Sequence, residues 1–275
     1  MLGTGLFSTS YTPAWSSASR FHLDGVNDEI NFATLSDSVE MGRFKEFCNT
    51  GFISFWFTTQ GGDEAEDPDK QFFTITNAKS SGDTAYMKCF YSLEESKIKF
   101  VRSDGNGANP VTTTLTLDNS LVCNNTFHHH IFLWWKQGED QGLYFNGTSP
   151  GAHISTGGTG GAWDNPNVIR YDVNWGKNIL DAPGDSFKGT ISNIMLSNIP
   201  SGLGGTQIAD LGIDYYNNGE PRNEINNSDL IIYLDGNHTE TSALNRVPST
   251  ANTPSIDTYK SFALTNGTVV STEFF

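Results

Sequence analysis

The sequence predicts an all-β protein, a two-sheet antiparallel jelly-roll sandwich with one short helix. Three observations lead to this prediction. Short apolar and aromatic segments alternate with turns rich in Gly, Asn, Asp and Ser, as in KIKFVRSDGNGANPVTTTLTL. The chain has 28 glycines and is only 17% charged, and long runs of helix-favouring Glu, Lys, Leu and Ala are scarce. Short polar turns between many strands are typical of two packed antiparallel sheets.

The predicted strands begin with FHLDGVNDEINF (21–32), which reads as a strand, a turn and a second strand. GFISFWFT (51–58) is apolar on both faces, so we expect it to be a central strand. The other predicted strands are QFFTIT (71–76), AYMKCFYSL (85–93), KIKFVRS (97–103), VTTTLTL (111–117), the hairpin FHHHIFLWWKQGEDQGLYFNG (127–147), VIRYDVNW (168–175), FKGTISNIMLSN (187–198), LIIYLDG (230–236) and FALTNGTVV (262–270).

The predicted helix is TQIADLGIDYYNNGEP (206–221). Its apolar residues Ile208, Leu211 and Tyr215 fall on one helical face, and Asn-Gly ends it before Pro221.

Residues 21–275 are predicted to form a single domain, because no internal repeat and no long linker divides them. Residues 1–20 are rich in Ser and Thr and carry scattered apolar anchors, among them Leu6 and Phe7. We interpret them either as a loosely ordered terminus or as an N-terminal arm that packs on this domain or on a neighbour.

The charge balance argues against two classes of partner. The chain has 16 basic and 31 acidic residues, a formal net charge of −15. Such a surface repels nucleic acid phosphates and anionic lipids, so we expect neither nucleic acid nor membrane as a partner. The N-terminal sequence lacks the basic and apolar regions of a secretory signal, so we expect the protein to be made and folded in a cytoplasm.

Five segments, in order along the chain, resemble laminin-G-like domains of the concanavalin A-like lectin and glucanase superfamily. FHLDGVNDEINF resembles the opening strand pair, and GFISFWFT resembles the next strand. FHHHIFLWWKQGEDQGLYFNG resembles the central hairpin, and FKGTISNIMLSN resembles the late Gly-x-Ile strand. DYYNNGEP followed by LIIYLDG resembles the closing turn and strand. The resemblance implies a concanavalin A-like sandwich of the kind found in phage virion proteins.

The three consecutive histidines in the hairpin do not predict a metal site. Side chains of a strand alternate between its faces, so only His128 and His130 could point the same way. Because they belong to a motif that resembles the family hairpin, we interpret them as markers of its register.

The opposite face of this strand predicts an interface. The resemblance implies one core face and one more polar face, yet here the second face carries apolar side chains. We therefore expect the N-terminal arm, a long loop or another subunit to cover it. The predicted interface residues are Leu6, Phe7, Ile131, Leu133 and Trp135.

Calcium is the ion that the resemblance implies, since related sandwiches often bind it through loop oxygens. No cofactor is otherwise expected. The candidate ligands are Asp24, Asn27 and Asp28 in the first hairpin and Asp104 and Asn106 in SDGNGANP. The alternative is that these acidic loops are simply solvated.

The motifs of catalysis are not found in the sequence. The superfamily's glucanases carry Glu-x-Asp-x-x-Glu on one strand, and no predicted strand here contains it. Gly-x-Ser-x-Gly, a Walker loop and a dinucleotide fingerprint are also missing, so we expect no enzyme.

Glycan binding would use exposed aromatic rings beside Asn, Asp and Gly loops. The loop TGGTGGAWDNPN (156–167) fits this description, and the alternative is that its ring pins the loop onto the sandwich. The predicted glycan-binding residues are Trp163, Asp164 and Asn165, with Trp175 and Tyr215 as weaker candidates.

Two functional hypotheses follow. The first is a non-catalytic structural or adhesion protein of a phage particle, such as a capsid decoration, tail or fibre protein. It would be made in the host cytoplasm and would contact other virion proteins or itself, for example as a trimer, and also cell-surface glycans. The alternative is a monomeric carbohydrate-binding lectin module of a secreted or surface protein, with an extracellular location.

Overall fold

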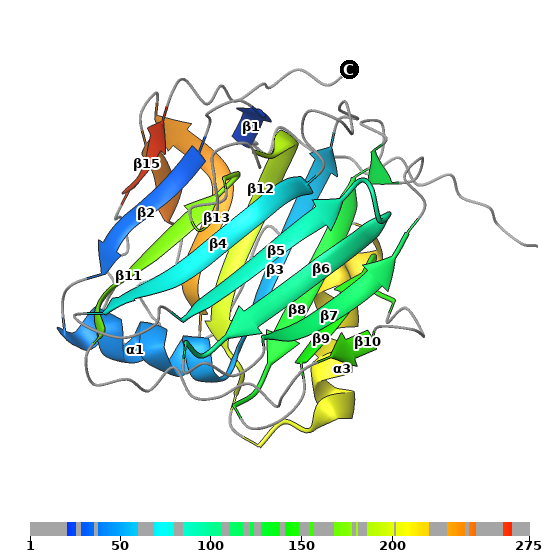
Figure 1. Cartoon of the computed structure of the whole chain (residues 1–275), viewed down its shortest axis with the longest axis horizontal. Coiled ribbons are helices and arrows are strands. Elements are labelled where there is room, and N and C mark those ends of the chain that lie inside the picture. Colours follow the sequence, from blue (N-terminus) through cyan, green and yellow to red (C-terminus); the bar gives the residue numbers. More distant parts are fainter. Residues whose placement is uncertain are drawn as a thin grey trace, which may run out of the picture.

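The computed structural model shows antiparallel strands arranged in two layers, with helices packed outside them (Figure 1). The predicted fold class is therefore confirmed. The residues that the structure describes are 21–25, 29–35, 38–59, 69–79, 85–105, 110–117, 122–123, 128–137, 141–148, 154–156, 168–177, 180, 186–200, 202–219, 230–239, 242–245 and 261–265.

The described strands follow one hydrogen-bonded path in the order β10-β7-β6-β5-β4-β11-β2-β15-β14-β13-β12-β3-β8-β9, with β1 paired to β12. Their bounds are β1 Phe21–Asp24, β2 Glu29–Leu35, β3 Gly51–Thr59, β4 Asp69–Lys79, β5 Tyr86–Ser92, β6 Lys97–Ser103, β7 Val111–Thr116, β8 His129–Trp135, β9 Gln141–Phe145, β10 Ile154–Thr156, β11 Val168–Trp175, β12 Lys188–Asn198, β13 Leu230–Thr239, β14 Ser242–Asn245 and β15 Ser261–Thr265.

This path folds over on itself. One layer, here called the front sheet, contains β10, β7, β6, β5, β4 and β11 (Figure 1). The other layer, the back sheet, contains β13, β12, β3, β8 and β9, and the path between the two layers runs through β2, β15 and β14. Every paired strand is antiparallel to its neighbour, as for β4 with β5 and β3 with β8.

Aromatic side chains from the two sheets meet in the core between them. The ring of Phe55 on β3 lies 5.1 Å from the ring of Trp175 on β11 and 6.3 Å from that of Phe73 on β4. Near one edge, Phe100 on β6 meets Trp135 on β8 at 5.6 Å. Burying each such side chain contributes roughly 1.5–3 kcal/mol, so these contacts hold the layers face to face.

Helix α1 (Ser38–Asn49) was not predicted from the sequence. It contacts β3 and β12 of the back sheet and β11 of the front sheet, so it spans both layers (Figure 1). Phe44, Phe47 and Cys48 share its buried face. The indole Nε1 of Trp135 donates hydrogen bonds to the carbonyl oxygens of Phe47, at 3.0 Å, and Cys48, at 3.1 Å. These bonds satisfy carbonyls that the last turn of a helix leaves without partners.

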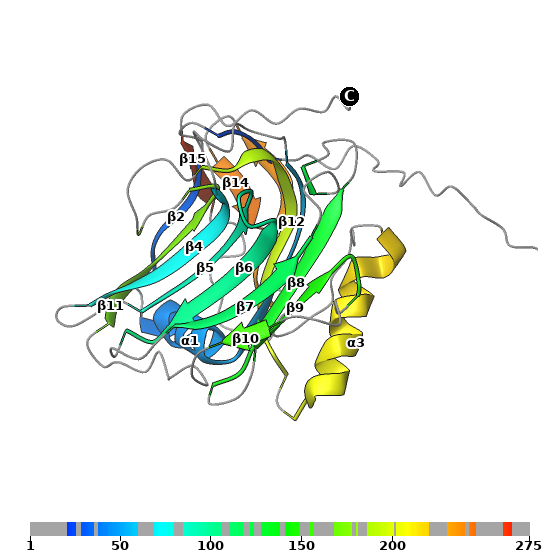
Figure 2. The same ribbon diagram turned by 45° about the vertical axis from the view of Figure 1, so that its right-hand side comes forward.

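Helix α3 (Gly205–Tyr216) was predicted, and it packs on the outer face of the back sheet beside β8 (Figure 2). At its start the Gln207 side-chain oxygen accepts a hydrogen bond from the Gly204 N–H at 2.7 Å. Asn217, in the left-handed conformation, ends the helix and opens the short 3₁₀ turn η1 (Asn217–Gly219). None of the helices in the described part of the chain is long and apolar enough to cross a membrane.

The arrangement corrects the expected interface. Ile131, Leu133 and Trp135 are each 0% exposed and belong to the core between the two sheets. It is the opposite face of β8, with Phe132, that needs a cover, and α3 supplies it through Tyr215, whose ring lies 6.0 Å from that of Phe132. The chain's own front sheet and its own helix therefore cover both faces of β8. Leu6 and Phe7, the other predicted interface residues, lie outside the described residues.

Candidate functional site

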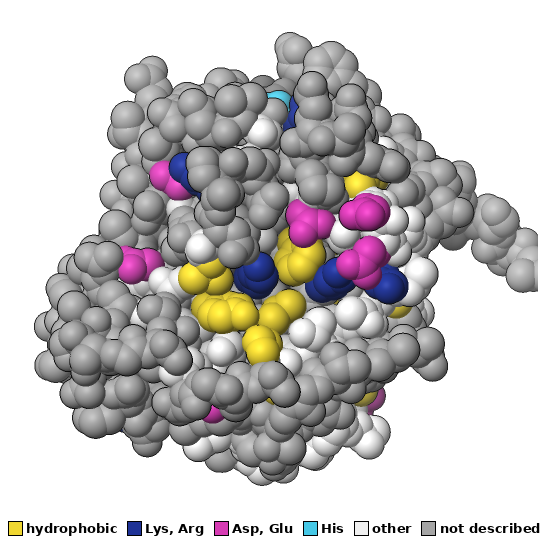
Figure 3. Space-filling view, viewed as in Figure 1, with side chains coloured by type: hydrophobic (Ala, Val, Ile, Leu, Met, Phe, Trp, Pro, Cys, Tyr) yellow, Lys and Arg dark blue, Asp and Glu magenta, His cyan; other side chains and the backbone are white. Residues whose placement is uncertain are grey.

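The outer face of the front sheet carries a group of basic side chains around one aromatic ring. In β5, Met87, Cys89 and Tyr91 are buried in the core, so the alternating residues Lys88 and Phe90 point to the opposite, outer face. Figure 3 views this sheet from outside and shows Lys and Arg side chains beside hydrophobic ones near the middle of the face. We call Lys88, Phe90, Lys97 and Lys99 the lysine face. The Phe90 ring is only 7% exposed, so the lysines and not the ring offer the binding groups.

Cross-strand register brings the lysines to the ring. Lys99 on β6 lies directly opposite Phe90 on β5, and Lys88 lies two residues before Phe90 on the same strand. The Nζ atoms of Lys88 and Lys99 are 5.4 Å and 5.6 Å from the centre of the Phe90 ring. Both ammonium groups therefore interact with the negative face of one ring, and these contacts hold two positive charges close together.

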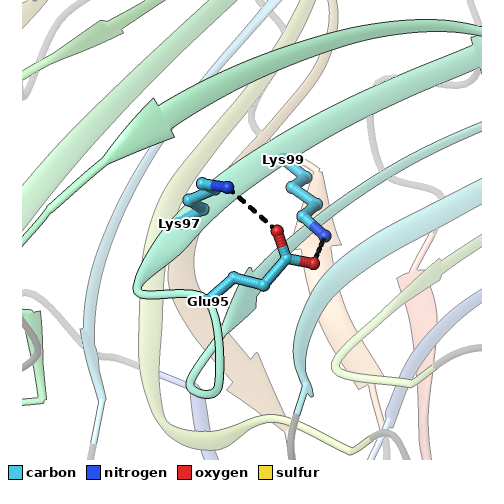
Figure 4. A network of polar contacts seen from close by, with 3 residues as sticks. All are labelled: Glu95, Lys97 and Lys99. Atoms are coloured by element: carbon cyan, nitrogen blue, oxygen red, sulfur yellow. Dashed lines mark hydrogen bonds and ion pairs between the residues drawn. The ribbon is translucent and has the colours of Figure 1, made fainter.

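Glu95 joins this group from the turn between β5 and β6. Its carboxylate accepts hydrogen bonds from Lys99 and from Lys97, the latter at 3.1 Å (Figure 4). The side chains are partly exposed, 42% for Glu95, 35% for Lys97 and 19% for Lys99. The hydrogen bonds from Lys99 and then Lys97 hold the pKa of the Glu95 carboxyl below its usual value.

Hydroxyl groups and aliphatic surface adjoin the lysine face. Thr114 on β7 lies opposite Lys99, and Thr112 lies opposite Val101, which is itself opposite Lys88. Both threonines are half-buried. Ammonium groups donate strong hydrogen bonds to carboxylates and sulfates, and hydroxyls bind sugar hydroxyls. The face can therefore bind a polyhydroxylated ligand with an acidic group.

Two of the predicted glycan-binding residues, Trp175 and Tyr215, do not lie on such a face. Trp175 is 2% exposed and its ring packs against Phe73 in the core, at 5.0 Å. Tyr215 is 5% exposed and lies between α3 and the back sheet, 5.1 Å from the ring of Phe52. A sugar cannot stack on a buried ring, so this corrects the prediction for both residues. The predicted loop residues Trp163, Asp164 and Asn165 lie outside the described residues.

Of the expected calcium ligands, only Asp104 has a side chain among the described residues. Asp104 follows β6 and is half-buried. Asp24 ends β1, but its side chain lies outside the described part of the chain, as do the predicted ligands Asn27, Asp28 and Asn106. Among the described residues, no group of three His, Cys, Asp or Glu side chains could hold a metal ion.

Two of the three consecutive histidines, His129 and His130, are structural residues. His130 Nε2 lies 2.7 Å from Ser54 Oγ, and the Asn146 side chain accepts from the His130 N–H at 2.8 Å and lies 3.1 Å from His129 Nδ1. Burial lowers the pKa of His130 to about 3. The Ser54–His130 pair has the contact of a catalytic dyad, but both residues are 0% exposed and no substrate can reach them.

The sequence carries a signal for the lysine face. In AYMKCFYSL and KIKFVRS, the alternate positions opposite the core residues hold Lys88, Phe90, Lys97 and Lys99. Lysine side chains that recur on the outer face of adjacent strands indicate a surface that can bind anions. Which of them become neighbours depends on strand register, which alternation alone does not show.

No protein-family model and no curated protein sequence matches the chain. Among the solved structures that match is the mouse laminin alpha1 chain, domains LG4-5, with 13% identity and a TM-score of 0.40, over 65% of this chain and 40% of that one. The Ruminococcus gnavus IT-sialidase CBM40 matches with 12% identity and a TM-score of 0.47, over 71% of this chain and 98% of that one.

A third match is the enzymatically active domain of bacteriophage CBA120 tailspike protein 2, with 14% identity and a TM-score of 0.45. It covers 77% of this chain and 29% of that one. With identities of 12–14% and TM-scores below 0.5, none of these likenesses assigns a function to the chain.

Proposed function

We propose that this protein is a non-catalytic β-sandwich that binds acidic glycans through the lysine face. The observation that carries the proposal is the placement of two ammonium groups, from Lys88 and Lys99, over the single ring of Phe90. A carboxylate or sulfate on a sugar would accept hydrogen bonds from both groups, and such charge-assisted bonds are about twice as strong as neutral ones.

The charge of the whole chain makes this face selective. With a net charge of −15, most of the surface repels anions, so an acidic ligand is favoured only where lysines gather. Because the lysines are partly exposed, salt screens them, and binding should weaken as ionic strength rises. Thr112 and Thr114 offer hydroxyls to the sugar ring beside the acidic group.

A binding titration with trigalacturonic acid, whose rings each carry a carboxylate, tests this function. The double variant Lys88→Met, Lys99→Met removes both ammonium groups but keeps aliphatic chains over the ring. We expect its affinity to fall by at least about tenfold, the effect of losing two charge-assisted contacts.

The matched control is Lys188→Met with Lys177→Met, which removes two positive charges that do not belong to the lysine face, one on β12 and one just after β11. It should bind almost as tightly as the native protein. Equal affinity of the lysine-face variant and the native protein, or equal losses in the two double variants, would refute the site.

For the biological setting we propose an adhesion protein of a phage particle, as a capsid decoration, tail or fibre protein that is made in the host cytoplasm. Binding of cell-surface glycans is what such an adhesin requires. The alternative is a monomeric lectin module of a secreted or surface protein. Measuring the mass of the protein in solution, with and without residues 1–20, separates the two proposals. An oligomer such as a trimer that forms only when residues 1–20 are present supports the particle protein. A monomer that binds glycan equally well without residues 1–20 supports the lectin module.

A further inference from the structure

Glu95 is held in place by the turn that carries it. Within the turn that joins β5 to β6, the Ser96 N–H donates to the Leu93 carbonyl at 3.3 Å, and Ser96 has a positive φ of 52°. The Ser96 carbonyl in turn accepts from the Leu117 N–H at 2.9 Å, beyond the end of β7. The turn is thus fastened to the neighbouring strand. It presents the Glu95 carboxylate to the lysine face at a defined position.

The carboxylate uses the same donors that an acidic ligand would need. Lys99 both bonds Glu95 and lies 5.6 Å from the centre of the Phe90 ring. Lys97 bonds the other carboxylate oxygen at 3.1 Å. A ligand carboxylate placed beside the Phe90 ring would find Lys99 already bonded to Glu95. The ligand and Glu95 carboxylates would then compete for one ammonium group and repel each other.

We propose that Glu95 is an internal competitor that occupies the lysine face until an acidic glycan displaces it. This inference rests on the proposed function, because it concerns regulation of the same site. The displaced Glu95 turns to solvent, where it is already 42% exposed. Neutral sugars carry no negative charge that must pair with Lys99. Glu95 therefore weakens the binding of acidic ligands selectively.

The variant Glu95→Gln removes the competing charge and keeps the shape of the side chain. An exposed ion pair is weak, so we expect trigalacturonic acid to bind roughly two- to tenfold tighter to Glu95→Gln than to the native protein. The control is Glu94→Gln in the same turn, since Glu94 is also exposed and the substitution changes net charge equally. It should change the affinity by less than about twofold, as expected for a charge that bonds no lysine.

A second ligand and a second readout complete the experiment. Fully methyl-esterified trigalacturonate has the same rings without the charge, and Glu95→Gln should leave its affinity unchanged. In the native protein, the ¹³C resonance of the Glu95 carboxyl followed against pH should report a higher pKa when trigalacturonic acid is bound, because the lysine hydrogen bonds have been lost.

The outcomes separate this inference from the proposed function. If Glu95→Gln and Glu94→Gln change the affinity equally, or if bound ligand leaves the Glu95 titration unmoved, the competitor is refuted while the lysine face stands. If the double variant Lys88→Met, Lys99→Met binds trigalacturonic acid as the native protein does, the proposed function fails and the competitor fails with it.

Discussion

Acidification should destabilise the protein through one buried histidine, His130. Its ring lies on β8, 2.7 Å from Ser54 Oγ and 4.9 Å from the Trp56 ring, and Tyr216 of α3 covers it at 6.0 Å. Burial lowers its pKa from 6.5 to about 3. Its Nδ1 is buried with no hydrogen-bond partner in the structure. A proton at Nδ1 would therefore create a buried charge without compensation.

The sign and size of the effect follow from these two pKa values. Between pH 6.5 and 3 the unfolded chain binds a proton at this residue that the folded chain does not. Stability is therefore complete above pH 6.5 and falls as the pH drops toward 3, with a limiting slope of about 1.4 kcal/mol per pH unit. From pH 7.5 to pH 5 the free energy of unfolding should fall by about 2 kcal/mol because of His130 alone.

Urea denaturation at pH 7.5, 6 and 5 measures this loss, with the variant His130→Gln as the comparison. Glutamine can still hydrogen-bond Ser54, but it does not titrate. The variant should be less stable than the native protein at pH 7.5, because it loses ring contacts, yet this deficit should shrink as the pH falls. His22→Gln in β1 is the control for removing a different histidine. The reasoning is refuted if the native protein and His130→Gln lose the same stability between pH 7.5 and 5.

Two further predictions concern packing. A Cβ at Gly212 would lie 3.1 Å from the Phe132 ring, so Gly212→Val should push α3 off the back sheet and destabilise the protein by about 1–3 kcal/mol in thermal denaturation. Gly205→Ala, which meets nothing within 4 Å, should be neutral or stabilising, and equal effects of the two variants would contradict this account. The guanidinium of Arg102 is buried 5.7 Å from the centre of the Trp135 ring, its Nε and Nη2 have no hydrogen-bond partner, and burial lowers its pKa to about 10. Arg102→Met should therefore leave the free energy of unfolding unchanged or raise it. A loss above about 2 kcal/mol in urea denaturation would show instead that the guanidinium is stabilising.

Local patterns in the sequence were enough to place most of the strands and helix α3. The run GFISFWFT is apolar at adjacent positions, and β3 (Gly51–Thr59) is indeed buried along its whole length between β12 and β8. For α3, the spacing of Ile208 and Tyr215 and the Asn-Gly stop predicted a helix that packs through one face. Alternation, spacing and turn residues act within a few residues, so a single sequence displays them.

Helix α1 depends on long-range contacts that local sequence patterns do not show. Its sequence SVEMGRFKEFCN is only weakly amphipathic. It is anchored by contacts to both sheets and by the bonds from Trp135 to its last carbonyls. The spacing of Phe44, Phe47 and Cys48 was the available signal.

The sequence by itself determined that this chain forms an antiparallel sandwich, and it determined which residues of each strand share a face. Only the tertiary structure decided that Ile131, Leu133 and Trp135 face the core while α3 covers Phe132. Only the register of β5 against β6 placed Lys99 opposite Phe90. These choices depend on partners far apart along the chain, and alternation is equally satisfied whichever face is turned inward.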